Sequence, residues 1–301
     1  MGSRAKIKTD KGITDNIEIK KGSKQGDKIS AIIFCVVIAM VFMITEEEVN
    51  SGFRIGGETI TSLEYSDDSA IMSEELELLQ KFIDRFVVNC NKVGLKIHIG
   101  KTKSMTTNKM MKDMKITING KKVETVTKFL YLGHKITYDN DGKIALDHRI
   151  GLGWAAFQKN EKILASKVIP LTIKVKIYKT YILPVILYGA NCITWKENLL
   201  QKLEVFQNDM MRYMIGVKRI DKVTIEDLRQ RCRIDPVSDI VKDSTLKLYN
   251  KIKASVKGVA KLCFEGMVEG KRSRGRPKQR WRDNVMKWKG FSSWKDLLQN
   301  T

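Results

Sequence analysis

Two adjacent carboxylates, Asp67 and Asp68, are the residues of this 301-residue chain whose types and spacing best suit chemistry. Neighbouring residues on a straight strand point to opposite faces, so these side chains act together only where the chain turns. Short apolar runs on both sides predict a tight hairpin with its tip at residues 66–69. Two acids at a turn repel each other unless a cation lies between them. Mg²⁺ is a hard cation that binds carboxylate and phosphate oxygens together.

Two interpretations of this acidic turn stay open. In the first, Asp67 and Asp68 are the protein ligands of a two-metal site for phosphoryl transfer. In the second, the sequence Ser-Asp-Asp-Ser is an ordinary solvated turn, because Asp and Ser are common in turns of every kind. The turn alone does not distinguish a metal site from a surface loop, so the surrounding sequence has to decide.

The elements that must hold the acids can be predicted from the residues around them. Residues 59–65 and 69–72 are typical of two short strands. Upstream, the 16 residues from Ile29 to Ile44 are apolar except for Ser30, and they fall short of the ~20 residues that span a bilayer. We expect a buried core helix capped by Ser30, with a membrane anchor as the alternative.

Downstream, the spacing of apolar residues predicts a further segment of helix and strands, and then a mostly helical second half of the chain. A helix capped by Ser73 should end at Gly94, and a half-buried strand should follow over residues 95–99. Asn119-Gly120 predicts a hairpin, and residues 129–136 should continue the sheet. Helices are expected from Lys143 onward, with breaks at Pro170, Pro184 and Gly216. Thr224 should cap a short helix, and a longer helix should cover about residues 237–256. A small amphipathic helix with a tail is expected over residues 283–301.

The composition indicates a globular protein with a polyanionic partner. Hydrophobic residues make up 43% of the chain, and the formal net charge is +21. Residues 271–282 hold seven basic residues and no acid. Arginines in such an extended segment suit a narrow A·T-rich minor groove, and Trp281 can stack on a base. A nuclear-localisation cluster and a solvated basic loop fit the same residues. The candidate nucleic-acid contacts are Arg272, Arg274, Arg276, Lys278, Arg280 and Trp281.

Neither zinc nor secretion is indicated by the sequence. The five cysteines contain no C-x-x-C pair, and the three histidines lie at no zinc-ligand spacing. Free thiols and a start rich in Lys and Asp predict an intracellular protein, nuclear or cytoplasmic and not secreted.

Several motifs in a fixed order resemble the reverse transcriptases of non-LTR (LINE-type) retrotransposons. They are KGSKQGDKIS at 21–30, EYSDDSA at 64–70, VGLKIH at 93–98 with Lys101 and Lys103, FLYLG at 129–133, VILYG at 185–189 and GRPKQRW at 275–281. The resemblance runs from about Lys20 to Trp281. It implies an α+β fold: a partial right-hand polymerase palm at residues 1–110, primer-grip-like strands at 111–142, a helical thumb-like region at 143–220, and a helical C-terminal region with the basic segment at 221–301.

The resemblance also implies a role for individual residues. Asp67 and Asp68 would be metal-binding catalytic carboxylates, and Lys101 would protonate the leaving group. Gln25, Gly26 and Tyr65 would contact template and incoming nucleotide, although Lys28 stands where the family usually has Pro. Tyr131, Leu132 and Gly133 would grip the primer. The implied cofactor is Mg²⁺, with Mn²⁺ as a substitute, and the implied partners are an RNA template, a DNA primer and deoxynucleoside triphosphates, without a membrane.

One part of the family pattern is missing. The family's earlier palm carboxylate precedes the loop that begins at Gly22, and neither Asp10 nor Asp15 matches its aromatic-Asp context. We therefore expect a C-terminal fragment of a reverse transcriptase with little or no polymerase activity by itself. A non-enzymatic basic DNA- or RNA-binding protein derived from a retrotransposon is the first alternative, and a membrane-associated basic protein is the second.

Overall fold

The long apolar segment near the N-terminus forms helix α1, Lys28–Glu48, in the computed structural model, which describes residues 3–10, 12–19, 26–108, 114–256, 258–265 and 278–292. The Asp27 side chain accepts a hydrogen bond from the Ile29 N–H at 3.1 Å. Asp27 therefore caps the helix, and the prediction of Ser30 as N-cap is wrong, because the helix begins two residues earlier.

The helix was expected to be buried, and most of its length is not. Val41, Phe42 and Thr45 are buried near its C-terminal end. The large apolar side chains that remain exposed are Ile29, Ile32, Ile33, Val36, Met40, Met43 and Ile44. Residues Ile29–Glu48 are long and apolar enough to cross a membrane by length and composition, a test that core helices also pass. Because this helix is apolar on all sides, its sequence has no hydrophobic periodicity that would distinguish a buried face from an exposed one.

The described residues divide into two compact units. The first unit comprises Met1–Phe53, Thr61–Ile99 and Ile116–Lys122, and the second comprises Arg54–Ile60, Gly100–Lys115 and Val123–Thr301. The four-part division at residues 110, 142 and 220 stays a prediction.

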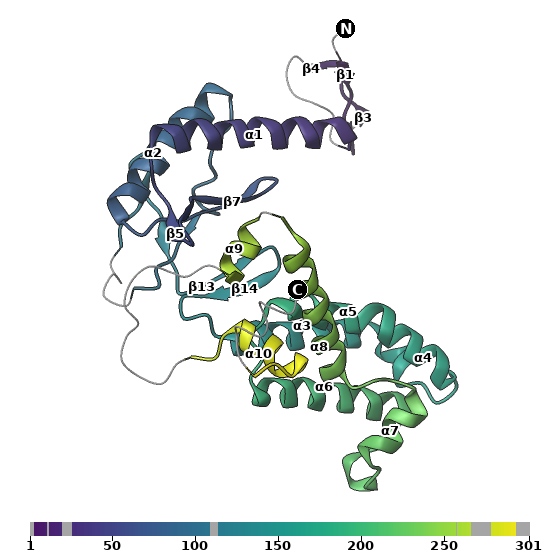
Figure 1. Ribbon diagram of the computed structural model, residues 1–301. Helices are drawn as coiled ribbons and strands as arrows, with labels where there is room; N and C mark the ends of the chain where they lie inside the picture. Colours follow the sequence, from purple (N-terminus) through teal and green to yellow (C-terminus); the bar gives the residue numbers. More distant parts are fainter. Residues whose placement is uncertain are drawn as a thin grey trace. The chain divides into compact units, whose positions relative to one another are not determined.

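In the first unit, α1 packs side by side with α2, Leu76–Lys92 (Figure 1). The rings of Phe42 and Phe86 lie 4.4 Å apart, centre to centre, in a small core that also contains Phe82 and Cys90. Gly94 follows α2 with φ 80°, as its predicted position at the helix end requires. Ser73 accepts from the Glu75 N–H, but Glu75 is the N-cap, so the predicted cap is displaced by two residues.

Residues 95–99 do not form the predicted strand. Leu95 and Ile97 are half-buried and pack against the first unit's core, while Lys96 and His98 are exposed. The alternation of apolar and polar residues was therefore correct, but these residues belong to no strand of the described sheets.

Every described sheet has two strands. The strands pair as β1 Ser3–Ala5 with β4 Ile17–Ile19, β2 Lys8–Thr9 with β3 Gly12–Ile13, β5 Phe53–Ile55 with β6 Glu58–Ile60, β7 Ser62–Tyr65 with β8 Asp68–Ile71, β9 Lys103–Ser104 with β12 Glu124–Thr125, β10 Thr117–Ile118 with β11 Lys121–Lys122, and β13 Lys128–Tyr131 with β14 His134–Thr137. The Asn119-Gly120 turn is confirmed, with φ 50° and 73° at its two residues. Residues 129–136 form their own hairpin rather than one continuing strand.

The second unit is mostly helical, as predicted. Its helices are α3 Gly142–Leu164, α4 Leu171–Ile177, the π-helix η2 Tyr178–Ile182, α5 Leu183–Leu187, the 3₁₀ turns η3 Ala190–Cys192 and η4 Arg219–Asp221, α6 Glu197–Ile215, α7 Ile225–Cys232, α8 Val237–Ala254, α9 Val259–Glu265 and α10 Trp281–Lys289. The breaks at Pro170, Pro184 and Gly216 and the cap at Thr224 are confirmed. The π-helix ends two residues before Pro184, a residue that has no N–H to donate.

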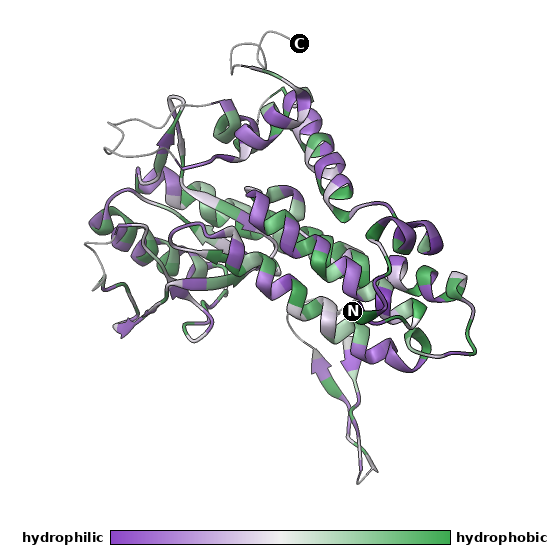
Figure 2. Cartoon of the chain, turned by 90° about the horizontal axis from the view of Figure 1, so that it is seen from below, coloured by the Kyte–Doolittle hydropathy of each residue, from purple (hydrophilic) through white to green (hydrophobic). Residues whose placement is uncertain are grey.

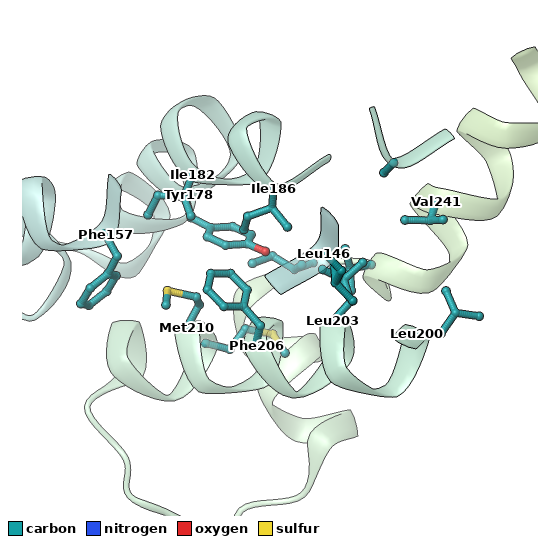
Figure 3. Close-up of a cluster of buried hydrophobic side chains, with 14 of the residues drawn as sticks. Leu146, Phe157, Tyr178, Ile182, Ile186, Leu200, Leu203, Phe206, Met210 and Val241 are labelled. Atoms are coloured by element: carbon teal, nitrogen blue, oxygen red, sulfur yellow. The ribbon is translucent and has the colours of Figure 1, made fainter. Parts of the chain in front are cut away.

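The core of the second unit lies between α6 and the broken helix 171–187. In Figure 3, Tyr178, Ile182 and Ile186 point down toward Phe206 and Met210 of α6. Each fully buried side chain of this size contributes about 1.5–3 kcal/mol of burial free energy. The helices alternate between green and purple around their axes in Figure 2, as amphipathic helices do. This core fixes the helices against which the β13–β14 hairpin is held.

Candidate functional site

The predicted acidic hairpin is present as β7–β8. Tyr65 pairs with Asp68, so Ser66 and Asp67 alone form the turn. Ser66 has φ 56°, which a two-residue hairpin turn requires of its first central residue. The predicted tip at residues 66–69 is therefore confirmed in place, but Asp68 and Ser69 already belong to the return strand.

The two carboxylates are exposed at this tip. In the part of the chain that the structure describes, neither the Asp67 nor the Asp68 carboxylate has a hydrogen-bond or ion-pair partner. The described residues also contain no group of three or more His, Cys, Asp or Glu placed to hold a metal. Two carboxylates with open oxygen atoms suit Mg²⁺, which is commonly held by one or two carboxylates together with substrate phosphates.

The register of β7–β8 sorts its side chains onto two faces. Ser62 and Glu64 share one face, where the Ser62 hydroxyl lies 3.0 Å from Glu46 Oε1 of α1 and 3.1 Å from Glu64 Oε1. Tyr65 and Asp68 share the opposite face. Asp68 and the exposed ring of Tyr65 therefore lie together on the side of the hairpin that does not contact Glu46.

A second pair of acids lies behind the turn. Burial raises the pKa of the Glu64 carboxyl; the Ser62 hydrogen bond opposes this rise, and the charge of Glu46 adds to it. The sequence motif contains Glu64, but its pairing with Glu46, 18 residues earlier, was not predicted. These acids add negative charge to the hairpin, which favours binding of cations over anions there.

The predicted nucleotide contacts are only partly described. Tyr65 is 65% exposed at the end of β7. Gly26 has φ 95°, and an added Cβ would meet nothing within 4 Å. Glycine is therefore favoured at this position by the positive φ and not by a close neighbour. Gln25 lies outside the described residues. The roles of all three residues stay predictions.

Lys101 belongs to the second unit, where it is exposed in the turn 99–101 just before β9. Its neighbour Lys103 is engaged within the same unit, with Nζ 2.5 Å from Glu124 Oε2 of the paired strand β12. The role of Lys101 toward a leaving group stays a prediction.

The predicted primer-grip residues form a second tight hairpin. Tyr131 pairs with His134, and Leu132 and Gly133 form the turn with φ 46° and 73°. Positive φ at both central residues is typical of a type I′ turn, which Gly suits and Leu does not.

Side chains from two helical segments hold this turn. The Arg149 side chain of α3 donates to the Gly133 carbonyl, and the Tyr188 hydroxyl, just after α5, donates to the Leu132 carbonyl at 2.8 Å. The Arg149 guanidinium lies 4.4 Å from the centre of the Tyr188 ring. Neither Arg149 nor Tyr188 was predicted from the sequence; the one signal was that Tyr188 belongs to the family-like block 185–189.

The described end of the basic segment is anchored to the helical core. Lys278 and Arg280 are exposed. Trp281 is half-buried, its indole N–H donates to the Asn191 carbonyl at 2.7 Å, and its ring meets Phe264 at 5.7 Å between centres. These contacts give Trp281 a structural role, and base stacking by this residue stays a prediction. Arg272, Arg274 and Arg276 lie outside the described residues.

A second contact fixes the same end. The Asn284 amide exchanges two hydrogen bonds with the Trp195 backbone, at 2.9 and 2.7 Å, and Gln279 Nε2 donates to the Trp195 carbonyl at 3.0 Å. Residues 279–284 thereby bind the segment 190–195, so the basic stretch is attached to a rigid element at its C-terminal end.

Part of the chain is similar to known proteins. Residues 5–136 match the family model described as reverse transcriptase (RNA-dependent DNA polymerase). A protein of Caenorhabditis elegans described as transposon-derived is 24% identical over 198 residues, which cover 63% of this chain and 70% of that protein. Residues 5–136 are therefore similar to a reverse transcriptase domain, and this stretch includes both the acidic turn and the turn at Leu132–Gly133. Such a domain implies a palm-type polymerase fold, and the mixed helix and strand structure is consistent with it.

Proposed function

We propose that this chain, with its reverse transcriptase segment at residues 5–136, is part of the RNA-directed DNA polymerase of a non-LTR (LINE-type) retrotransposon. The observation that carries the proposal is the exposed pair Asp67 and Asp68 at the tip of β7–β8, with carboxylate oxygens that no described residue engages. Asp67 and Asp68 would hold divalent metal ions, Mg²⁺ or Mn²⁺, for two-metal nucleotidyl transfer.

The chemistry assigns separate tasks to the chain's own residues. When bound, Mg²⁺ supplies Lewis acidity that favours ionisation of a primer 3′-hydroxyl and neutralises charge on the departing pyrophosphate. Asp67 and Asp68 would hold the metal ions through their carboxylate oxygens, and Tyr65, on the same face as Asp68, would pack against the incoming nucleotide. Lys101 donates a proton to the pyrophosphate, which stabilises charge that develops as it leaves.

Other parts of the chain bind the nucleic acid. Gln25 and Gly26 contact template and nucleotide, and the backbone of residues 131–133 contacts the primer strand. The helices over residues 143–220 act as a thumb, and the basic stretch 271–282 binds phosphates through its arginines and lysines. The partners are an RNA template, a DNA primer and deoxynucleoside triphosphates, and the protein works inside the cell, in the nucleus or cytoplasm.

Polymerase activity of the chain alone should be weak or absent. The described residues contain no third metal-binding side chain beside Asp67 and Asp68. A site with one ligand too few binds its metals weakly and positions them poorly. A first palm carboxylate supplied by another segment would restore activity.

The test is binding of an RNA–DNA primer–template, measured with and without Mg²⁺ and the matching nucleotide. We expect the nucleotide and Mg²⁺ together to slow dissociation, and Asp67→Asn with Asp68→Asn to abolish this effect. The matched control is Glu74→Gln with Glu75→Gln, which removes two adjacent exposed acids from the same unit and should leave the effect intact.

Two outcomes would overturn this function. Salt-dependent binding that ignores Mg²⁺, nucleotide and the Asp substitutions would indicate a non-enzymatic basic DNA- or RNA-binding protein. Efficient primer extension by the chain alone, lost in the Asp67→Asn and Asp68→Asn variant, would confirm the carboxylates and contradict the proposed need for a further ligand.

A further inference from the structure

The most heavily buried charge near either hairpin is the guanidinium of Arg149. This side chain is 7% exposed, and none of the described ion pairs includes it. Burying a charge without an opposite charge is costly, so its remaining contacts have to offset the loss of water. Those contacts are the Gly133 carbonyl and the face of the Tyr188 ring.

Tyr188 binds the same turn from a different segment. Its hydroxyl donates to the Leu132 carbonyl at 2.8 Å, while its ring supports Arg149. Both carbonyls of the turn are thus held by side chains that lie 16 and 56 residues away in sequence. A hairpin that needed only to fold would not need two helical side chains at its tip, because its ladder bonds already pair the strands.

The hairpin and the helical segments approach each other closely at two glycines, and the approach is tightest at Gly189. A Cβ on Gly133 would lie 3.4 Å from Arg149 Nη2 and 3.5 Å from the Tyr188 ring. A Cβ on Gly189 would lie 2.8 Å from His134 Nδ1, inside the closest approach that real side chains make. Two glycines with positive φ therefore let hairpin and helices meet at close range.

We propose that Arg149 and Tyr188 are positioning residues that form a latch on the turn Leu132–Gly133 and set where the hairpin meets the primer strand. This inference rests on the proposed function for the role of the hairpin, although the latch itself is a contact within the second unit. Arg149 and Tyr188 contact the turn backbone, and we expect them to act on the primer through Tyr131, Leu132 and Gly133.

The latch also accounts for the strained turn. Leu132 has φ 46°, and an L-residue in this region costs about 1–2 kcal/mol. A hydrogen bond from Tyr188 to the carbonyl of that same residue stabilises the strained conformation rather than a relaxed one. The primer would then meet a backbone that is already in its binding geometry, which lowers the entropy cost of gripping it.

The first experiment measures the latch without any nucleic acid. Hydrogen exchange of the amides in residues 128–137 would be compared in the wild type, Tyr188→Phe, Arg149→Met and Arg149→Lys. Tyr188→Phe removes only the hydroxyl, and we expect exchange about fivefold faster at the hairpin, as loss of one hydrogen bond predicts. Arg149→Met should have a larger effect, and Arg149→Lys should restore part of the protection because it keeps a charged donor.

Tyr181→Phe is the matched control, since it removes the hydroxyl of an exposed tyrosine in η2. It should leave exchange at residues 128–137 within twofold of the wild type. Unchanged hairpin exchange in Tyr188→Phe, with the helical core still protected, would overturn the latch even if Arg149→Met failed to fold.

The second experiment adds the primer and separates the latch from the proposed function. A primer with a photoreactive base at its 3′ end would be crosslinked to the protein, and the crosslinked peptide identified by mass spectrometry. We expect crosslinks to residues 128–137, reduced about fivefold in Tyr188→Phe, while total affinity for the duplex changes less than twofold.

If the wild type binds the duplex without crosslinking to these residues, the hairpin does not contact the primer. The inference then fails, whatever the exchange data show. If the crosslinks persist at full yield in Tyr188→Phe and in Arg149→Met, the latch fails and the proposed function stands.

Discussion

The hairpins β7–β8 and β13–β14 have the same construction and opposite surroundings. Each has two four-residue strands, a two-residue turn and a tyrosine as the last residue before the turn, Tyr65 in one and Tyr131 in the other. The tip of the first hairpin presents two exposed carboxylates that have no hydrogen-bond or ion-pair partner among the described residues. The second turn has both of its carbonyls held by Arg149 and Tyr188.

This difference follows from what each turn would have to do. A metal ligand must keep its oxygens open until the cation arrives, so bonds from the protein to Asp67 or Asp68 would compete with metal binding. A backbone that binds the primer strand gains affinity when it is already ordered before binding, because binding then costs less conformational entropy. We therefore expect the two hairpins to respond in opposite ways to the same kinds of substitution.

The largest effect is expected from Gly133→Ala in the latched hairpin. Its φ of 73° disfavours any Cβ, while the added atom itself would meet Arg149 and Tyr188 only at ordinary contact distances. We expect a loss of about 2 kcal/mol in the free energy of unfolding. The measurement is urea unfolding followed by tryptophan fluorescence, since all five tryptophans belong to the second unit. A loss below about 0.5 kcal/mol would show that the turn is not held as described.

A smaller effect is expected from pH, again only in the latched hairpin. Burial lowers the pKa of His134, and the charges of Arg149 and His148 lower it further. Its protonated form is therefore favoured in the unfolded state: the hairpin should be fully stable above the ordinary imidazole pKa of about 6.5 and lose stability as pH falls below it.

Hydrogen exchange at residues 128–137, corrected for its intrinsic pH dependence, checks this effect. Protection should fall about threefold between pH 7.5 and pH 5.5, and His134→Gln should flatten the profile. Protection that rises toward acid pH would contradict a lowered pKa. The β7–β8 amides serve as the internal comparison, because that hairpin contains no histidine.

The smallest effect, and one of opposite sign, is expected from Ser66→Gly in the open hairpin. Ser66 has φ 56°, so glycine relieves strain there, while it also adds freedom to the unfolded chain. The net change should be a stabilisation of less than about 1 kcal/mol. Hydrogen exchange at residues 62–71 would measure it, and a marked loss of protection would indicate that the Ser66 side chain supports the turn.

Much of the local structure could be predicted because single residues determine it. Gly216, Thr224 and the Asn119-Gly120 turn have conformations or hydrogen bonds that few other residues supply, so their positions were predicted correctly. Pro184 likewise required a break, although its form, a π-helix over Tyr178–Ile182, could not be read from the sequence.

The errors occurred where the outcome depends on distant partners. Helix α1 is apolar on all sides, so its pattern could not reveal that Ile32 and Val36 are exposed while Phe42 is buried. The acidic turn was predictable from a contiguous motif. The latch was not, because Arg149 and Tyr188 meet the turn only after α3 and α5 have packed, and neither residue carries a local signal for that contact.

The proposed function requires above all that Asp67 and Asp68 bind a divalent metal, and iron-directed cleavage tests this directly. Fe²⁺ would replace Mg²⁺ in the complex with primer–template and nucleotide, and ascorbate with peroxide would cut the protein backbone next to the bound ion. The account predicts cuts within residues 64–70 that excess Mg²⁺ suppresses, that Asp67→Asn with Asp68→Asn removes, and that Glu74→Gln with Glu75→Gln leaves in place. Cuts confined to other segments, or cuts at 64–70 that persist in the double Asn variant, would contradict it.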